Sequence, residues 1–188
     1  MVKHLTGEQV RRLMVFLRED ARRNGSVWRV RRWMALELAL LTGLRVSEVA
    51  ALHWDDIRLD SDGGWVLVRR GKGGRSRAVR FGGRLAAALL QYRRITGDGG
   101  YLFPGRASGH ISPRTLQLWL KGALAEAGLP RDFTFHSLRH TYATTLYIRS
   151  NHNLRLVQRQ LGHADMRSTQ LYTAVDPTAY DAVFDSLY

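Results

Sequence analysis

The sequence predicts a mainly α-helical domain with one small antiparallel β-sheet, an α+β fold in a single unit. Three observations support this prediction. Apolar residues recur at helical spacing through most of the 188 residues. Between positions 57 and 81 the pattern changes to β-forming residues around a glycine-rich turn. Apolar residues make up 45% of the chain, which is enough to fill a hydrophobic core at this length.

The first quarter of the chain predicts three helices. Thr6 and Gln9 form a capping box that starts the first helix. The second helix is expected over residues 27–41, with Gly43 as its C-terminal cap. A third, short helix is expected to begin near Arg45.

The middle of the chain predicts the sheet. Residues 57–59 are expected to form a short strand. Residues 65–70 and 77–81 flank the turn at 71–74, and this arrangement is typical of a β-hairpin.

Helical spacing returns after the hairpin. Ser112 followed by Pro113 is a strong helix start, because proline suits the first helical position. The first helix expected in this half carries residues 85, 89 and 92 at helical spacing and ends at Gly97. The others are expected over residues 113–127, from His136 or Ser137 past residue 148, over residues 153–161, and from Asp176-Pro177 to the C-terminus.

The charge balance favours a polyanionic partner. The chain has 29 Lys and Arg against 16 Asp and Glu, for a net charge of +13, and such an excess is attracted to nucleic acid through counterion release. A preference for arginine also contributes, since only Lys3, Lys72 and Lys121 are lysines. Seven arginines within the first two predicted helices form either a DNA-facing surface or a solvated helix face. They are Arg11, Arg12, Arg22, Arg23, Arg29, Arg31 and Arg32.

Composition also excludes several classes of protein. Cysteine is absent, which removes disulfides, thiolate catalysis and cysteine-based zinc sites, and fits a reducing cytoplasm. No run of about 18 apolar residues is present, so the sequence predicts no membrane span.

Four short motifs carry the candidate chemistry. They are Thr42-Gly43-Leu44-Arg45-Val46-Ser47-Glu48, the turn that holds Lys72, His136-Ser137-Leu138-Arg139-His140, and Leu161-Gly162-His163 followed nine residues later by Tyr172. Each motif is weak alone, and their order and spacing make the signal specific.

These residue types suit metal-free cleavage of a phosphodiester. Tyr172 is the candidate nucleophile, because a phenolate is also a tolerable leaving group when the strand is rejoined. Arg45 and Arg139 are candidates to clamp the phosphate, because guanidinium groups match phosphate oxygens bidentately and stay charged. His136 lies three residues before Arg139, on the same face of a helix. It either bonds the phosphate, helps to move the tyrosine proton, or serves only as a helix-capping or packing residue. Without further support, Tyr172 reads as an ordinary half-buried aromatic and the two arginines as surface residues.

His136 and His140 also have the i, i+4 spacing of a zinc pair. Ser137 stands where the zinc proteases with an H-E-x-x-H motif carry their glutamate. We therefore reject a zinc-protease interpretation of this helix.

Taken together, the four motifs closely resemble the signature of the tyrosine recombinases of the phage-integrase family, over nearly the whole chain. The resemblance implies the fold of their catalytic domain and DNA cutting and rejoining through a 3′-phosphotyrosyl intermediate, with neither a metal ion nor a nucleotide cofactor. It implies double-stranded DNA as partner and a tetramer of protomers on paired sites. A protein of this kind is expected in the cytoplasm, associated with the nucleoid.

The resemblance also implies roles for further residues. Lys72 would protonate the leaving 5′-oxygen, although a turn lysine is usually only solvated; the arginine preference elsewhere favours a role that needs proton transfer. His163 would donate a hydrogen bond to the phosphate. Glu48 is expected to orient Arg45, to stabilise a helix start, or both, and His140 is expected to be a supporting, structural residue.

Within a single catalytic domain over residues 1–188, we expect a core at 1–172 and a tail at 173–188. The tail has an apolar face, and it either docks on a neighbouring protomer or folds back on its own domain. Relatives typically carry an N-terminal core-binding domain before a start that resembles Leu5-Thr6, and we expect no such domain within these residues, which form either a fragment or a naturally minimal enzyme.

Two other functions stay open from the sequence. A type IB topoisomerase would use the same tyrosine chemistry to relax supercoils. A non-catalytic DNA-binding module on a degenerate recombinase fold is the alternative from a different class.

Overall fold

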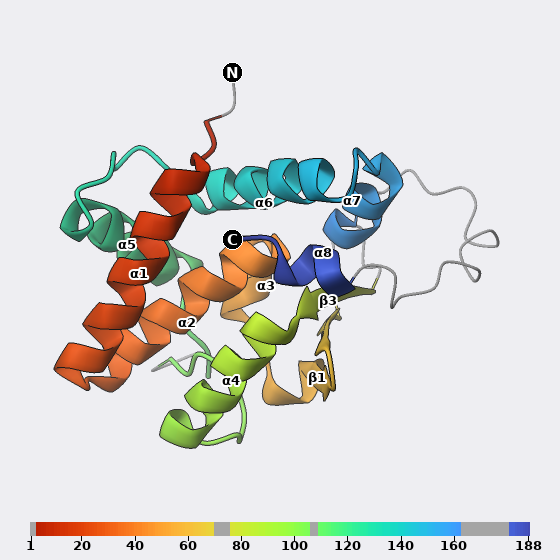
Figure 1. Cartoon of the computed structure of the whole chain (residues 1–188). Helices are drawn as coiled ribbons and strands as arrows, with labels where there is room; N and C mark the ends of the chain where they lie inside the picture. The colour runs from red at the N-terminus through yellow and green to blue at the C-terminus, as the bar shows by residue number, and fades with distance from the viewer. Residues whose placement is uncertain (1–2, 70–75, 106–108, 163–180) are drawn as a thin grey trace.

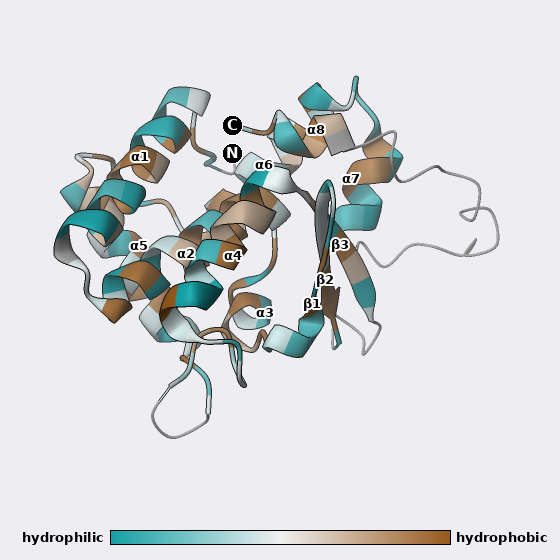
Figure 2. Cartoon of the chain, turned by 60° about the horizontal axis from the view of Figure 1, so that its bottom comes forward, coloured by the Kyte–Doolittle hydropathy of each residue, from teal (hydrophilic) through white to brown (hydrophobic). Residues whose placement is uncertain are grey.

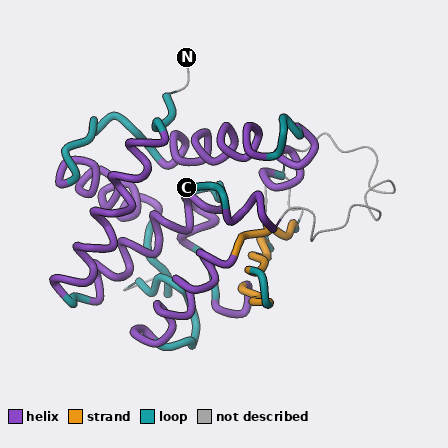
Figure 3. Tube along the Cα trace, viewed as in Figure 1, coloured by secondary structure: helices purple, strands orange, loops and turns teal. Residues whose placement is uncertain are grey.

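The computed structural model describes residues 3–69, 76–105, 109–162 and 181–188. Within them the chain is mostly helical with one three-stranded antiparallel sheet in the order β1-β2-β3 (Figures 1 and 3), which confirms the predicted fold class. The elements are α1 (Gly7–Asn24), α2 (Val27–Thr42), α3 (Val46–Ala50), the 3-10 turn η1 (Trp54–Asp56), β1 (Ile57–Asp60), β2 (Gly63–Val68), β3 (Arg77–Gly82), α4 (Gly83–Thr96), α5 (Pro113–Glu126), α6 (Phe135–Arg149), α7 (Leu154–Leu161) and α8 (Asp181–Asp185).

Two of the predicted helix starts are confirmed in detail. Thr6 accepts from the backbone N–H of Gln9 at 3.2 Å, and the Gln9 side chain accepts from the Thr6 N–H at 2.9 Å. Ser112 caps α5 ahead of Pro113. The helix expected from His136 or Ser137 begins slightly earlier, at Phe135, because Thr134 is its cap. The helix start predicted at Asp176-Pro177 lies outside the described residues.

Helix α2 forms the centre of the core. Its residues from Met34 to Leu41 are all buried, and it packs against α1, α4, α5 and α6. The sheet lies beside this helical group, with its β3 strand against α7 and α8 (Figure 2). As a result, the end of α2, the start of β3 and the end of α7 come close together.

The predicted arginine surface needs one correction. The side chain of Arg32 is only 2% exposed, and it lies between Asp20, at 2.6 Å, and Glu126, at 2.7 Å. Arg32 therefore belongs to a buried ion cluster that joins α1, α2 and α5, and it is unavailable to a DNA surface.

The last eight residues pack on their own chain. Phe184 and Leu187 are buried, the Asp185 carboxylate accepts from the Gly83 N–H at 2.7 Å, and the Tyr188 hydroxyl donates to Thr145 at 3.0 Å. Residues 181–185 thus pack against β3, α4 and α6 of the same chain. Residues 173–180 lie outside the described residues, so the two arrangements expected for the tail remain predictions.

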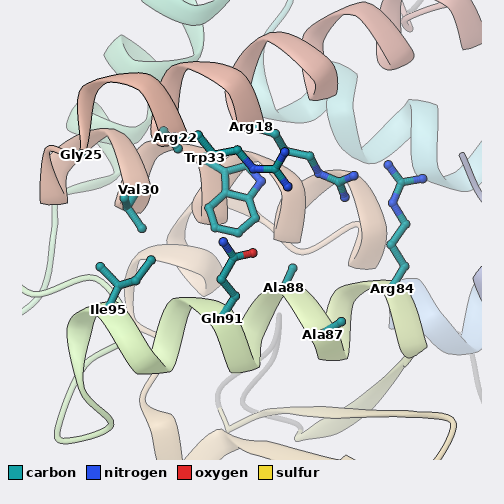
Figure 4. Close-up of a pocket in the computed structure, with 11 residues that line it drawn as sticks. Arg18, Arg22, Gly25, Val30, Trp33, Arg84, Ala87, Ala88, Gln91 and Ile95 are labelled. Carbon is teal, nitrogen blue, oxygen red and sulfur yellow. The ribbon is translucent and has the colours of Figure 1, made fainter.

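A cavity of about 570 Å³ lies between α1, α2 and α4 (Figure 4). Trp33 and Ala88 line its apolar part, and Arg18, Arg84 and Gln91 line its polar part. None of the described candidate site residues lines this cavity, so it is separate from the site below. No helix in the described ranges is long and apolar enough to cross a membrane.

Candidate active site

A left-handed glycine places Arg45. Gly43 ends α2 with φ +64°, and a Cβ built on it would lie 2.3 Å from Cδ1 of the buried Tyr142 ring. Only glycine fits this position without displacing the ring. The chain then turns sharply, and Arg45 becomes the N-cap of α3.

Glu48 is the centre of the cluster. Its side chain is 6% exposed, and it accepts from the Arg45 backbone N–H at 2.8 Å and from Arg45 Nη1 at 2.9 Å. Arg77, at the start of β3, donates to both carboxylate oxygens at 2.8 Å. Burial pushes the pKa of Glu48 upward, but the hydrogen bonds from Arg77 and Arg45 outweigh it, so the pKa lies below its ordinary value. Glu48 is therefore ionised and holds two guanidinium groups.

Arg139 links two helix ends to the same cluster. Its Nη1 donates to the Gly43 carbonyl at 2.7 Å and its Nη2 to the Leu161 carbonyl at 2.6 Å. Burial, together with the positive charges of Arg45 and Arg77, lowers its pKa to about 10. The group stays cationic at neutral pH. Arg45 and Arg77 therefore contact the Glu48 carboxylate directly, and Arg139 interacts electrostatically with all three groups.

His136 and His140 lie on the first two turns of α6. Their Nε2 atoms are 2.9 Å apart, and the rings meet edge to face with centroids 4.5 Å apart. His136 is exposed, whereas Arg139 on the next turn is buried. A ligand from solvent can therefore reach His136 more easily than Arg139.

Three predicted site residues, Lys72, His163 and Tyr172, lie outside the described residues. The backbone just before His163 is nevertheless well anchored. Arg139 holds the Leu161 carbonyl, and the Arg77 Nε donates to the Gln160 carbonyl at 3.3 Å. The start of the segment that leads to the candidate nucleophile is thus tied to the arginine cluster.

Arg77 was missed by the sequence reasoning. A usable signal was present, because Arg77, Val79 and Phe81 share one face of a strand, and the latter two are buried apolar residues. An arginine on the inward face of a strand needs a buried partner, and Glu48 is that partner.

Comparison with known proteins gives a consistent result. The family model described as the phage integrase family matches residues 3–179, a range that contains every candidate site residue. Tyrosine recombinase XerC of Xanthomonas axonopodis pv. citri (strain 306) is 41% identical over 155 residues, which cover 81% of this chain and 50% of the relative. XerC of Xylella fastidiosa (strain M23) is 40% identical, with coverage of 81% and 51%.

Solved structures agree. The XerH site-specific recombinase bound to palindromic difH substrate, in a post-cleavage complex, has a TM-score of 0.73 and 26% identity, with 95% of this chain and 51% of that chain covered. The XerA recombinase has a TM-score of 0.72 and 28% identity, with coverage of 98% and 65%. The integrase of mycobacterium phage Brujita shares the fold, with a TM-score of 0.75.

The fold is that of a domain found in DNA recombinases and integrases. The chain belongs to the phage integrase family, whose curated relatives here are tyrosine recombinases. These relatives do not favour the topoisomerase or the non-catalytic interpretation. The chain spans about half the length of the curated relatives that it matches.

Proposed function

We propose that this chain is the catalytic domain of a site-specific DNA recombinase that cleaves and rejoins strands through a 3′-phosphotyrosyl bond. The phenol oxygen of Tyr172 would attack the phosphorus, and the bond to the 5′-oxygen would break. The free 5′-hydroxyl of an exchanged strand would later attack the phosphotyrosine and release Tyr172. Because the bond energy is kept in the intermediate, no nucleotide is consumed.

The arginine cluster supports this proposal most directly. Arg45 and Arg139 are 94 positions apart in the sequence, yet the fold couples their charges within one cluster. Fixed positive donors of this kind stabilise the charge that develops on the non-bridging oxygens. Loss of either clamp is expected to raise the barrier by ~3–4 kcal/mol, by analogy with loss of an oxyanion donor.

The remaining roles follow from the motif positions. We propose that His136 and His163 donate hydrogen bonds to the phosphate and that Lys72 protonates the leaving 5′-oxygen. Glu48 and His140 would act as supporting residues.

The partners and the location are part of the same proposal. The substrate would be double-stranded DNA, on which protomers assemble as a tetramer over paired sites. The protein would act in the cytoplasm, where it would meet this DNA in the nucleoid. Support comes from relatives whose structures contain DNA, such as the XerH complexes with difH substrate.

A covalent trapping experiment tests the chemistry. The chain is incubated with nicked suicide duplexes that carry a randomised core, and covalent protein–DNA adducts are separated by denaturing electrophoresis. The unaltered protein and Tyr147→Phe, a control at a 37% exposed tyrosine of α6, should form the adduct. Tyr172→Phe should form none. An equal yield from Tyr172→Phe would show that another residue is the nucleophile.

A further inference from the structure

We propose that His136 and His140 together bind one divalent transition-metal ion of the zinc, nickel or copper(II) type, and that this ion inhibits the domain. The site differs from a catalytic zinc site, which the sequence argues against at this helix. Binding is independent of the proposed function, whereas the inhibitory consequence rests on it.

The spacing of the two ring nitrogens carries the proposal. Two nitrogens that each lie about 2.0–2.1 Å from a metal ion, at an angle between about 90° and 110°, are roughly 2.9–3.4 Å apart. The Nε2 atoms of His136 and His140 are 2.9 Å apart. Only a small rotation of the rings would be needed to direct both lone pairs at one ion.

The helix makes this geometry durable. Residues at i and i+4 lie on the same face, one turn apart, so both imidazoles are presented by one rigid element. Thr134 and Ser137 form the capping box that fixes the first turn of α6. His136 is exposed, which gives an ion access from solvent.

The chemistry of the donors selects the ion. Neutral imidazole nitrogen suits zinc, nickel and copper, whereas magnesium and calcium prefer oxygen ligands. Within the described residues no third His, Cys, Asp or Glu side chain joins this pair in a metal-binding group, and we propose that the ion is held by these two nitrogens. The hydrogen held between the two nitrogens would move to Nδ1 of its ring or to water, because each Nε2 must offer a lone pair.

Arg139, the cationic residue nearest to the two histidines in the sequence, makes its hydrogen bonds elsewhere. Arg139 directs its guanidinium to the carbonyls of Gly43 and Leu161 in the protein interior. These hydrogen bonds of its guanidinium thus go to the two carbonyls and not to the ring of His136. An ion on Nε2 of His136 would change the charge and the hydrogen-bonding capacity of the ring that we propose for the phosphate, so it would interfere with DNA chemistry at that residue.

Calorimetric titration of the folded chain tests the binding. Zinc chloride should bind the unaltered protein at this site, and the variants His136→Asn and His140→Asn should both lose that binding. His152→Asn, just beyond the end of the same helix, is the control and should bind zinc like the unaltered protein. Magnesium chloride should give no such binding. An identical zinc isotherm for the unaltered protein, His136→Asn and His140→Asn would overturn the proposal.

Adduct trapping tests the inhibition. Each protein is compared with its own zinc-free yield, so a lower basal yield of a variant does not matter. Zinc should reduce the relative yield of the unaltered protein and of His152→Asn, and EDTA should restore it. Equal relative inhibition of His140→Asn would overturn the inhibitory role. If no protein forms an adduct, the proposed function fails, while the calorimetric result still decides the metal site.

Discussion

Replacement of Arg77 by methionine tests whether Glu48 depends on a second guanidinium. Methionine keeps an unbranched apolar stem, and it removes both hydrogen bonds to the Glu48 carboxylate. The side chain of Arg77 is 11% exposed and that of Glu48 is 6% exposed, so water cannot readily replace the lost partner.

The expected loss of stability follows from these contacts. A hydrogen bond to a charged group contributes about 1.5–3 kcal/mol, and breaking a buried pair costs about 3–5 kcal/mol. Two effects reduce the cost here, because Arg45 still neutralises Glu48 and Arg139 loses a repulsive neighbour. We therefore expect a loss of about 2–4 kcal/mol, which at this chain length lowers the Tm by roughly 4–16 °C.

Urea unfolding followed by circular dichroism measures the free energy of unfolding. Arg93→Met is the matched control, because Arg93 pairs with Asp98 and both side chains are half exposed. Its free energy of unfolding should change far less than that of Arg77→Met. Equal losses for the two variants would refute the central role of Glu48 and Arg77.

The same variant should also affect chemistry under conditions where it is fully folded. Arg77 holds Glu48, which holds Arg45, and it also contacts the Gln160 carbonyl near the end of α7. Misplacement of a catalytic group by about 1 Å can reduce a rate roughly a hundredfold. The adduct rate of Arg77→Met should therefore fall by about ten- to a hundredfold, with partial rescue by Arg77→Lys. A rate equal to that of Arg93→Met would contradict this role.

Three further predictions concern the same cluster and its substrate. Gly43→Ala should cost about 2–4 kcal/mol in urea unfolding, since its Cβ meets the Tyr142 ring, whereas Gly25→Ala, at φ +54° with nothing within 4 Å, should cost about 1 kcal/mol. Because the folded pKa of Glu48 is depressed, its contribution is complete above its ordinary pKa of 4.5 and is lost as pH falls further. The free energy of unfolding of Glu48→Gln should accordingly fall less than that of the unaltered protein below about pH 4.5. DNA affinity, measured by fluorescence anisotropy, should drop steeply between ~50 and ~200 mM salt, and a constant affinity would refute an electrostatic interface.

Local signals in the sequence predicted most of the fold. The capping box of Thr6 and Gln9 and the Ser112-Pro113 start depend on neighbours within four residues, so a linear pattern contains them. Gly43 was predictable as a helix end for the same reason. Its second role, the close approach to Tyr142, depends on a residue 99 positions away, and only the folded structure shows it.

Long-range ion pairs account for what the sequence did not predict. Arg32 is one of seven arginines for which the sequence left a solvated helix face or a DNA-facing surface open. In the structure it pairs with Asp20 and Glu126 from two other helices. Arg77 likewise pairs with Glu48, 29 positions earlier. In a chain with so many arginines, composition cannot separate a buried guanidinium from an exposed one. For Arg77, the alternation of inward and outward residues along the strand was the one sequence feature that indicated burial.

The charge balance of the cluster suits the phosphate binding that we propose for it. Two guanidinium groups contact the Glu48 carboxylate, and the charge of a third, that of Arg139, interacts with them. The cluster therefore keeps an excess of positive charge after Glu48 is counted. Without Glu48, Arg45 and Arg77 would lose the carboxylate that holds them and leave their charges uncompensated in a partly buried site. With Glu48, and with the carbonyls of Gly43 and Leu161 on Arg139, the cluster is stable but still cationic. An anion that enters this site therefore meets donors that are already oriented, and little reorganisation is needed when its charge increases in the transition state.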